Sequence, residues 1–126
     1  MNALIDTDLL LDYLKGEKRA ATAMESCRHR SISVITWLEL MAACPAGLDE
    51  PTRGFLRSFE RLSVSESIAD EALRLMATRQ GLGLAHALTW ASANVNQLVY
   101  VTTDARWLTK VDSNVVVPYK SESAAV

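Results

Sequence analysis

The sequence predicts an α/β fold in which a short parallel sheet is covered by helices on both faces. An apolar run stops at Asp6, and a helix-periodic segment begins two residues later. The same sequence of apolar strand and polar end returns at residues 98–104. Short apolar runs alternate with helical segments along the rest of the chain, which is typical of parallel sheets. The expected strands are few and short, so helices dominate the prediction.

The composition limits the class of protein. A chain of 126 residues with 49% hydrophobic and 22% charged residues favours one globular domain over residues 1–126. The formal net charge is −2, so nucleic-acid binding would need a local basic patch. Cys27 and Cys44 are too few for a disulfide framework, and we expect no signal peptide before the first strand. The least charged stretch, 31–48, holds Glu39 at its centre and is a poor membrane span. We therefore expect a soluble, cytoplasmic protein.

The elements follow from hydrophobic periodicity and from helix-breaking residues. The first half of the chain predicts a strand at 3–5, a helix from residue 8, a polar helix over 17–30, a strand at 31–34 and a buried helix over 35–43. The second half predicts an amphipathic helix over 49–62, a stub of strand at 63–64, a helix capped by Ser65, a helix over 84–94, a strand at 98–101, a helical turn over 105–110 and a strand at 115–117.

Four side chains stand out as carriers of chemistry. Asp6 and Asp104 each follow an apolar strand, which puts both at the edge of the sheet where ligands bind. Glu39 is the only charged residue in 31–48, and a buried carboxylate is normally paired, bound to a metal or turned towards a crevice. His86 begins the helix over 84–94. Three of the four have a structural alternative: Asp6 (or Thr7) as a helix cap, Glu39 in a salt bridge with an arginine, and His86 as a structural histidine.

Carboxylates that converge on one site repel each other, and they stay ionised together only if a cation neutralises them. Carboxylate oxygens suit Mg²⁺ or Mn²⁺. Hydrolysis of a phosphodiester is the reaction that such a site serves best, because the metal activates a water and stabilises charge on the phosphate.

Four segments carry a resemblance to a known family: Leu4-Ile5-Asp6-Thr7-Asp8, Ser33-Val34-Ile35-Thr36-Trp37-Leu38-Glu39-Leu40, Leu82-Gly83-Leu84-Ala85-His86-Ala87-Leu88 and Val101-Thr102-Thr103-Asp104. In this order and spacing they resemble the motifs of the PIN domain, and more closely those of VapC-type toxin ribonucleases of bacterial toxin–antitoxin pairs. The resemblance covers nearly the whole chain. It implies a three-layer α/β/α fold, a Mg²⁺- or Mn²⁺-dependent endoribonuclease that cleaves RNA, a homodimer, and a small antitoxin whose tail blocks the active site.

Carried over position by position, the resemblance makes Asp6, Glu39 and Asp104 the catalytic, metal-binding carboxylates. Thr7 matches a hydroxyl that helps to hold the site, and Asp8 matches a position that is usually asparagine. Thr103, next to Asp104, is expected to support the site in the same way.

One position departs from the family pattern. The third carboxylate of the family falls where this chain has His86, and Ala85 replaces a proline that is often found before it. Neutral imidazole prefers softer ions than Mg²⁺ and brings no negative charge. Three interpretations stay open: a nuclease that uses the three remaining carboxylates, a nuclease in which His86 is a fourth ligand and shifts the preference towards Mn²⁺ or Zn²⁺, and a degenerate PIN-fold protein that only binds partners.

Residues near Asp104 are the best candidates for RNA contacts, namely Arg106 and Lys110. Three arginines at positions 53, 57 and 61 form either a second contact or a solvated helix face. Cys27 and His29 lack the partners of a zinc site. A different class, the haloacid-dehalogenase-type phosphotransferases, shares an aspartate pair like Asp6 and Asp8, but the chain is short for that fold.

Overall fold

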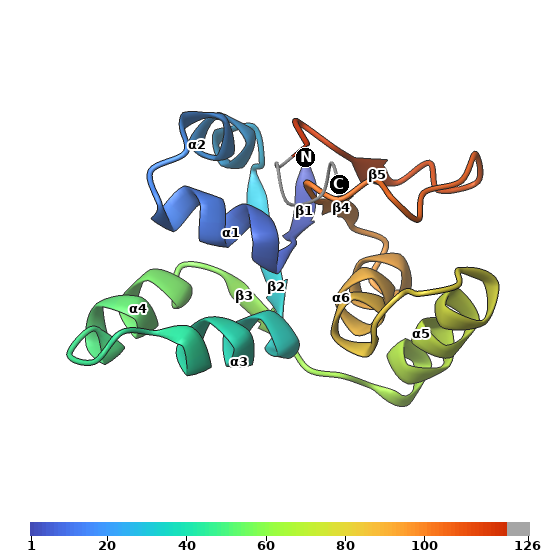
Figure 1. Cartoon of the computed structure of the whole chain (residues 1–126), viewed down its shortest axis with the longest axis horizontal. Helices are drawn as coiled ribbons and strands as arrows, with labels where there is room; N and C mark the ends of the chain where they lie inside the picture. The colour runs from blue at the N-terminus through green and yellow to red at the C-terminus, as the bar shows by residue number, and fades with distance from the viewer. Residues whose placement is uncertain (121–126) are drawn as a thin grey trace.

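The computed structural model describes residues 1–120 and consists of a five-stranded sheet with helices on both sides (Figure 1). In chain order the elements are β1 (Asn2–Ile5), α1 (Thr7–Leu14), α2 (Lys18–Glu25), β2 (His29–Ser33), α3 (Val34–Ala43), α4 (Asp49–Leu56), β3 (Glu60–Leu62), α5 (Glu66–Thr78), α6 (Leu84–Val95), β4 (Val99–Val101) and β5 (Val115–Val116). Among these residues no helix is long and apolar enough to cross a bilayer.

All five strands are parallel, in the order β3-β2-β1-β4-β5. The central strand, β1, pairs with β2 on one side and with β4 on the other. The expectation of a short parallel sheet is confirmed.

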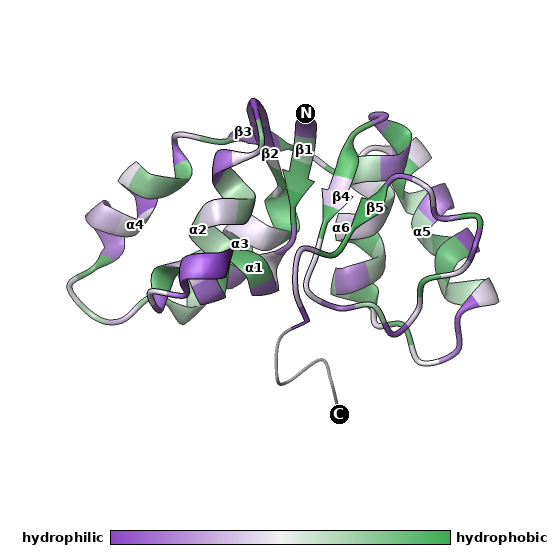
Figure 2. Cartoon of the chain, turned by 90° about the horizontal axis from the view of Figure 1, so that it is seen from above, coloured by the Kyte–Doolittle hydropathy of each residue, from purple (hydrophilic) through white to green (hydrophobic). Residues whose placement is uncertain are grey.

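The sheet separates two hydrophobic cores. Successive residues of a strand point to opposite faces, so Ala3 and Ile5 pack with α1, α2, α3 and α4, whereas Leu4 packs with α5 and α6. Tyr100 and Val101 of β4 divide between the two cores in the same way. Figure 2 shows the two groups of helices on either side of the strands. This is the expected three-layer α/β/α arrangement.

The chain changes direction across the sheet between β1 and β4. From β1 it moves outward to β2 and β3, and then returns through α5 and α6 to β4 on the other side of β1. Ligands of open α/β sheets bind beyond the carboxyl ends of the strands at such a switch point. Asp6 directly follows β1, and Asp104 lies three residues after the end of β4.

The prediction of one helix over 49–62 is wrong. Helix α4 ends at Leu56, a turn follows in which the Phe59 amide donates to the Leu56 carbonyl, and Glu60–Leu62 forms β3 beside β2. Leu56 and Phe59 are buried in either arrangement, so their spacing does not distinguish a helix from a helix and a turn. The pairing of β3 with β2, which is a tertiary interaction, decides the outcome.

Three other boundaries differ from the prediction. The polar helix ends at Glu25 rather than at residue 30, because His29 already lies beside β1 in β2. The strand stub falls at Glu60–Leu62 rather than at 63–64. Residues 105–110 form turns rather than a helical turn, and the Thr109 amide donates to the Asp112 carboxylate instead of to a helical carbonyl.

Candidate functional site

Asp6 lies at the junction of β1 and α1 and is 5% exposed. Its amide donates to the Val101 carbonyl, which extends the pairing of β1 with β4 by one residue. Its Oδ1 accepts the Thr7 amide at 2.9 Å, and its Oδ2 accepts the Thr102 hydroxyl at 2.6 Å. Asp6 therefore caps α1, as the structural alternative expected, and at the same time faces the switch point of the sheet.

Burial has the largest effect on the pKa of the Asp6 carboxyl group. Removal from water raises the pKa of Asp6 above its ordinary value, and the negative charge of Asp8 adds to this effect. His86 and the hydrogen bond from Thr102 act to lower it, but the net pKa shift is upward. A positive charge placed beside this carboxylate would therefore stabilise its ionised form.

Two threonine hydroxyls connect α1 to α3. The Thr7 hydroxyl lies 2.8 Å from the Thr36 hydroxyl and donates to Oε1 of Glu39 at 2.8 Å. Thr36 and Glu39 are three residues apart, so they share one face of α3. In the described part of the chain, Glu39 forms no ion pair with an arginine, and the salt-bridge alternative is wrong.

The structure brings the acidic segments together around one small pocket of about 70 Å³ at the carboxyl edge of the sheet, which we call the acidic pocket. Its lining residues come from the start of α1, from α3 and from the start of α6: Asp6, Thr7, Asp8, Glu39, Ala85, His86 and Thr89. Three carboxylates and one imidazole thus share a pocket, although the sequence places them on three separate segments.

Asp104 lies beside this pocket rather than in its lining. It is 4% exposed, and its amide donates to the Thr102 hydroxyl that also holds Asp6. The Arg106 guanidinium binds the Asp104 carboxylate with distances of 2.7 Å from Nη2 and 3.0 Å from Nε. Burial by itself would raise the pKa of Asp104, but the hydrogen bonds from Arg106 hold it below its ordinary value.

The expected RNA contacts occupy two different environments. Arg106 is engaged with Asp104 and lies 4.4 Å above the ring of Trp107, although about half of its side chain is exposed. Lys110 is exposed further along the same loop and does not line the pocket.

His86 is surrounded by aromatic rings. The centre of its imidazole ring lies 5.4 Å from the ring centre of Trp107 and 6.1 Å from that of Tyr100, both in edge-to-face arrangements. The ring centre of Trp90 is 6.3 Å away. One side of the ring therefore packs like a structural histidine, while the residue also lines the acidic pocket. The ring contacts support the interpretation of His86 as a structural histidine, and its role as a metal ligand stays a prediction.

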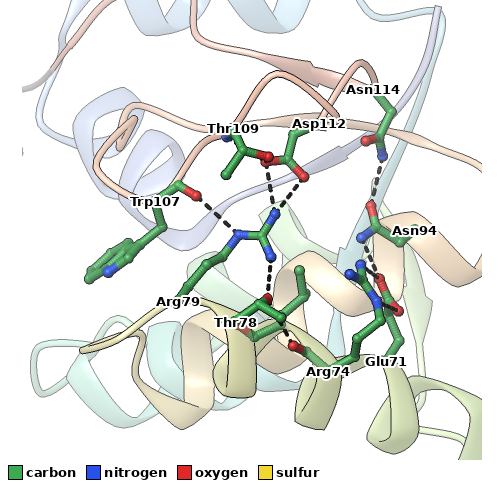
Figure 3. A network of polar contacts seen from close by, with 10 residues as sticks. Glu71, Arg74, Thr78, Arg79, Asn94, Trp107, Thr109, Asp112 and Asn114 are labelled. Carbon is green, nitrogen blue, oxygen red and sulfur yellow. Dashed lines mark hydrogen bonds and ion pairs between the residues drawn. The ribbon is translucent and has the colours of Figure 1, made fainter.

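The loop that carries Asp104 is anchored by a buried ion pair between Arg79, at the end of α5, and Asp112 (Figure 3). The two side chains are 5% and 7% exposed, and the Arg79 Nη2 atom lies 2.8 Å from Oδ1 of Asp112. Arg79 also donates from Nε to the Trp107 carbonyl at 3.0 Å. Neither residue was predicted from the sequence, because nothing in it pairs positions 33 residues apart.

The residues around Asp6 also differ in part from the prediction. Thr103 was expected to support the site, but the hydroxyl that donates to Asp6 belongs to Thr102. The buried hydroxyl of Thr103 has no hydrogen-bond partner within residues 1–120. The Tyr100 hydroxyl is likewise buried and without a partner there. Burial and the nearby Asp6 charge raise the pKa of Tyr100 well above its ordinary value. The alternation of residues along β4 is the only sequence signal that could have placed Tyr100 and Thr102.

The pocket fits a hard divalent cation in its chemistry. Three of its lining side chains offer carboxylate oxygens and His86 offers an imidazole nitrogen, and the raised pKa of Asp6 reflects a burial cost that a cation would offset. In their present positions, no three acidic, histidine or cysteine side chains of the described residues are close enough together to hold one metal ion. In this arrangement a cation would therefore have fewer than three of these side chains as ligands, and waters or substrate phosphates would complete its coordination.

Comparison with known proteins supplies a family. The PIN domain model matches residues 3–114 of the chain. This match is evidence against the phosphotransferase alternative. A search of the curated proteins finds no match.

Solved structures of similar fold come from several bacteria. A toxin-antitoxin complex from Klebsiella pneumoniae contains a chain 30% identical to this one, with 95% of this chain and 100% of that chain covered and a TM-score of 0.86. FitAcB from Neisseria gonorrhoeae is 20% identical, with 92% and 97% covered and a TM-score of 0.74. VapBC2 from Rickettsia felis, bound to a DNA fragment from their promoter, is 16% identical, with 92% and 96% covered and a TM-score of 0.71. The last two likenesses concern the fold alone.

Proposed function

Since this chain belongs to the PIN domain family, we propose that it is a metal-dependent endoribonuclease and the toxin of a toxin–antitoxin pair. One observation carries the proposal. Asp6, Asp8, Glu39 and His86 line a single pocket at the switch point of the sheet, and Asp104 is tied to Asp6 through Thr102. A cation would offset the burial cost of Asp6, and acidic side chains that face one pocket from separate segments are what phosphodiester hydrolysis with Mg²⁺ or Mn²⁺ requires.

Asp6, Glu39 and Asp104 are the residues that would hold the cation, with His86 as the fourth candidate. The metal, when bound, supplies a water activated for attack and positive charge against the phosphate. Asp6 is oriented by the Thr102 hydroxyl and by the Thr7 amide. Glu39 is oriented by the Thr7 hydroxyl, which Thr36 holds in place.

Arg106 has two parts to play in this proposal. It neutralises Asp104 in the absence of a cation, through the hydrogen bonds described above. Its half-exposed guanidinium and the exposed Lys110 are suited to contact the RNA backbone once a cation takes over that role.

A second candidate function rests on His86. A site with an imidazole in place of a carboxylate has one negative charge fewer, which weakens Mg²⁺ binding. If the loss abolishes turnover, the protein is a PIN-fold binding partner without catalysis. Metal preference separates these cases, because a working site with a histidine ligand favours Mn²⁺ or Zn²⁺ over Mg²⁺.

The proposed partners follow from the matched complexes. We propose that a small antitoxin binds this chain and blocks the acidic pocket, that the toxin forms a homodimer, and that it acts on RNA in the cytoplasm. The toxin-antitoxin complex from Klebsiella pneumoniae supports the antitoxin partner.

The test compares Asp6→Ala with Asp70→Ala on purified protein freed from any partner. Asp70 is exposed on α5, in the layer remote from Glu39, and is the matched control. Calorimetry with Mg²⁺, Mn²⁺ and Zn²⁺, together with cleavage of a labelled RNA, measures both properties. We expect metal binding and cleavage to be lost in Asp6→Ala and kept in Asp70→Ala. Cleavage that survives in Asp6→Ala would show that the site is assigned wrongly, and metal binding without cleavage would favour the second candidate.

A further inference from the structure

A second pocket, of about 310 Å³, lies between α3, α4 and β3. We call it the arginine pocket. It is lined by Trp37, Arg53, Leu56, Arg57, Phe59 and Arg61. The three arginines were expected to lie along one helix, but the turn after Leu56 and the strand β3 instead arrange them around a hollow with an aromatic wall.

The arginine pocket is positively charged and contains no carboxylate in its lining. Arg53 and Arg61 lie over the Trp37 ring at 5.5 and 4.6 Å, and among residues 1–120 neither forms an ion pair. Arg57 has only a distant, exposed partner, Glu50, at 3.7 Å. A chain with a net charge of −2 therefore gathers three of its 13 basic residues, largely unneutralised, around one hollow. The three positive charges repel one another. An anion bound in this pocket would relieve that repulsion and would be attracted by all three arginines.

The position of this pocket relates it to the acidic one. Helix α3 carries Thr36 and Glu39 towards α1 and the acidic pocket, and Trp37 towards α4 and the arginine pocket. An α-helix with its side chains is about 10–12 Å across, so the two pockets are separated by roughly one helix. Arg61 is one residue from the end of β3, and Trp37 follows the end of β2 by four residues. Arg57 and Phe59 precede β3, so the arginine pocket extends along α3 from the carboxyl edge towards the amino ends of the strands.

We propose that the arginine pocket binds a nucleotide of the single-stranded RNA, across α3 from the pocket where the RNA is cleaved. The arginines would hold its phosphate, and the planar guanidinium groups and the Trp37 indole would stack with its base. An acidic peptide would use the charge but not the stacked aromatic and guanidinium planes, so the observations favour RNA. The choice of RNA rests on the proposed function, whereas the anion site rests on the pocket itself.

The experiment measures binding of a short, fluorescein-labelled single-stranded RNA by anisotropy, with EDTA present so that cleavage does not interfere. The test variant is Arg53→Gln/Arg61→Gln, and the matched control is Lys18→Gln/Arg28→Gln, which removes the same charge from exposed positions around α2. We expect the test variant to bind at least about tenfold more weakly. In the test variant the slope of log RNA affinity against log salt concentration should become less negative by about 1.4, because two phosphate contacts are lost. The control should stay within about twofold of the wild type.

Arg57→Gln, at an exposed position with little effect on folding, serves as a second variant and should weaken binding by about three- to fivefold. Equal affinities for the wild type and the test variant, or equal losses in test and control, would overturn the proposal. So would arginine-dependent binding of a polyglutamate peptide by a protein that binds no RNA.

The two proposals fail separately. RNA binding that depends on the arginines, in a protein that cleaves RNA with none of the three metals, supports the arginine pocket and refutes the nuclease. Cleavage with an unchanged KM in Arg53→Gln/Arg61→Gln supports the nuclease and refutes the arginine pocket.

Discussion

The Thr102 hydroxyl donates a 2.6 Å hydrogen bond to Oδ2 of Asp6 and accepts the amide of Asp104 at 3.1 Å. One buried side chain thus connects the ends of β1 and β4, although Asp6 and Thr102 are 96 residues apart in the chain. The orientation of the Asp6 carboxylate depends on this contact, because its other oxygen is held only by the amide of Thr7.

Replacing Thr102 by valine tests this relationship. Thr102→Val keeps the shape of the side chain but leaves one Asp6 oxygen and the Asp104 amide without their partner. Loss of groups that orient metal ligands typically costs about 10–100-fold in affinity or activity, and we expect that loss in Mn²⁺ binding and in RNA cleavage. Thr102→Ser keeps the hydroxyl and should stay close to the wild type. An unchanged Thr102→Val protein would remove Thr102 from the site.

Replacing Arg106 by glutamine separates its two proposed roles. In Arg106→Gln a cation no longer competes with the guanidinium for Asp104, so Mn²⁺ binding measured by calorimetry should be tighter. A half-exposed pair of this kind is worth about 1 kcal/mol, which corresponds to about fivefold. RNA binding should be weaker, because a phosphate contact is lost. If Mn²⁺ binding and RNA binding both became tighter or both became weaker, the proposed division of roles would be contradicted.

Replacing His86 by aspartate tests the position that departs from the family pattern. His86→Asp adds a carboxylate to the acidic pocket, so the Mg²⁺ concentration needed for half-maximal cleavage should fall at least about tenfold. His86→Asn, which is of similar size and uncharged, is the control and should not gain Mg²⁺ affinity. Thermal unfolding should show both variants to be less stable by roughly 1 kcal/mol, because the aromatic contacts of the ring are lost.

Replacing Asp112 by asparagine tests the anchor of the loop. Because the ion pair with Arg79 is buried, Asp112→Asn should lower the free energy of unfolding by about 3 kcal/mol near neutral pH. Burial acts to raise the pKa of Asp112, but hydrogen bonds from Thr109 and Arg79 hold it below its ordinary value of 3.8. A depressed folded-state pKa stabilises the fold above the ordinary value, and that stability is lost as pH falls through the folded-state value.

The stability difference between the wild type and Asp112→Asn should therefore be constant from about pH 5 to 7 and shrink below about pH 3.8. Urea unfolding at each pH measures it. Asp70→Asn, at an exposed position of α5, should show no such difference at any pH. A stability difference between the wild type and Asp112→Asn that stayed the same in acid would show that the carboxylate charge of Asp112 does not contribute to the free energy of unfolding.

Several features of the site were predictable because they depend on local pattern. Apolar strands that end in a carboxylate predicted that Asp6 and Asp104 lie at one edge of the sheet, and the parallel strands β1 and β4 bring them there. Glu39 stood out because it is the only charged residue in an apolar stretch. The expected grouping of Asp6 with Glu39 and His86 agrees with the lining of the acidic pocket.

Other features were not predictable because they depend on which distant segments meet. The spacing of Leu56 and Phe59 suits a continuous helix as well as a helix and a turn, and only the pairing of β3 with β2 separates the two. The arginine pocket exists because of that turn. The pairing of Arg79 with Asp112 likewise has no local signal, since the two lie on different elements.

The sequence by itself determined the alternation of strands and helices, the family to which the chain belongs, and the acidic residues at the strand ends, because each of these depends on residue type and spacing along one segment. Only the tertiary structure decided which hydroxyl holds Asp6, that Arg106 pairs with Asp104, that His86 packs among aromatic rings, and that three arginines surround one pocket. The physical reason is that hydrogen bonds, ion pairs and ring contacts act over a few ångströms, so their partners are set by how the segments pack and not by their order in the chain.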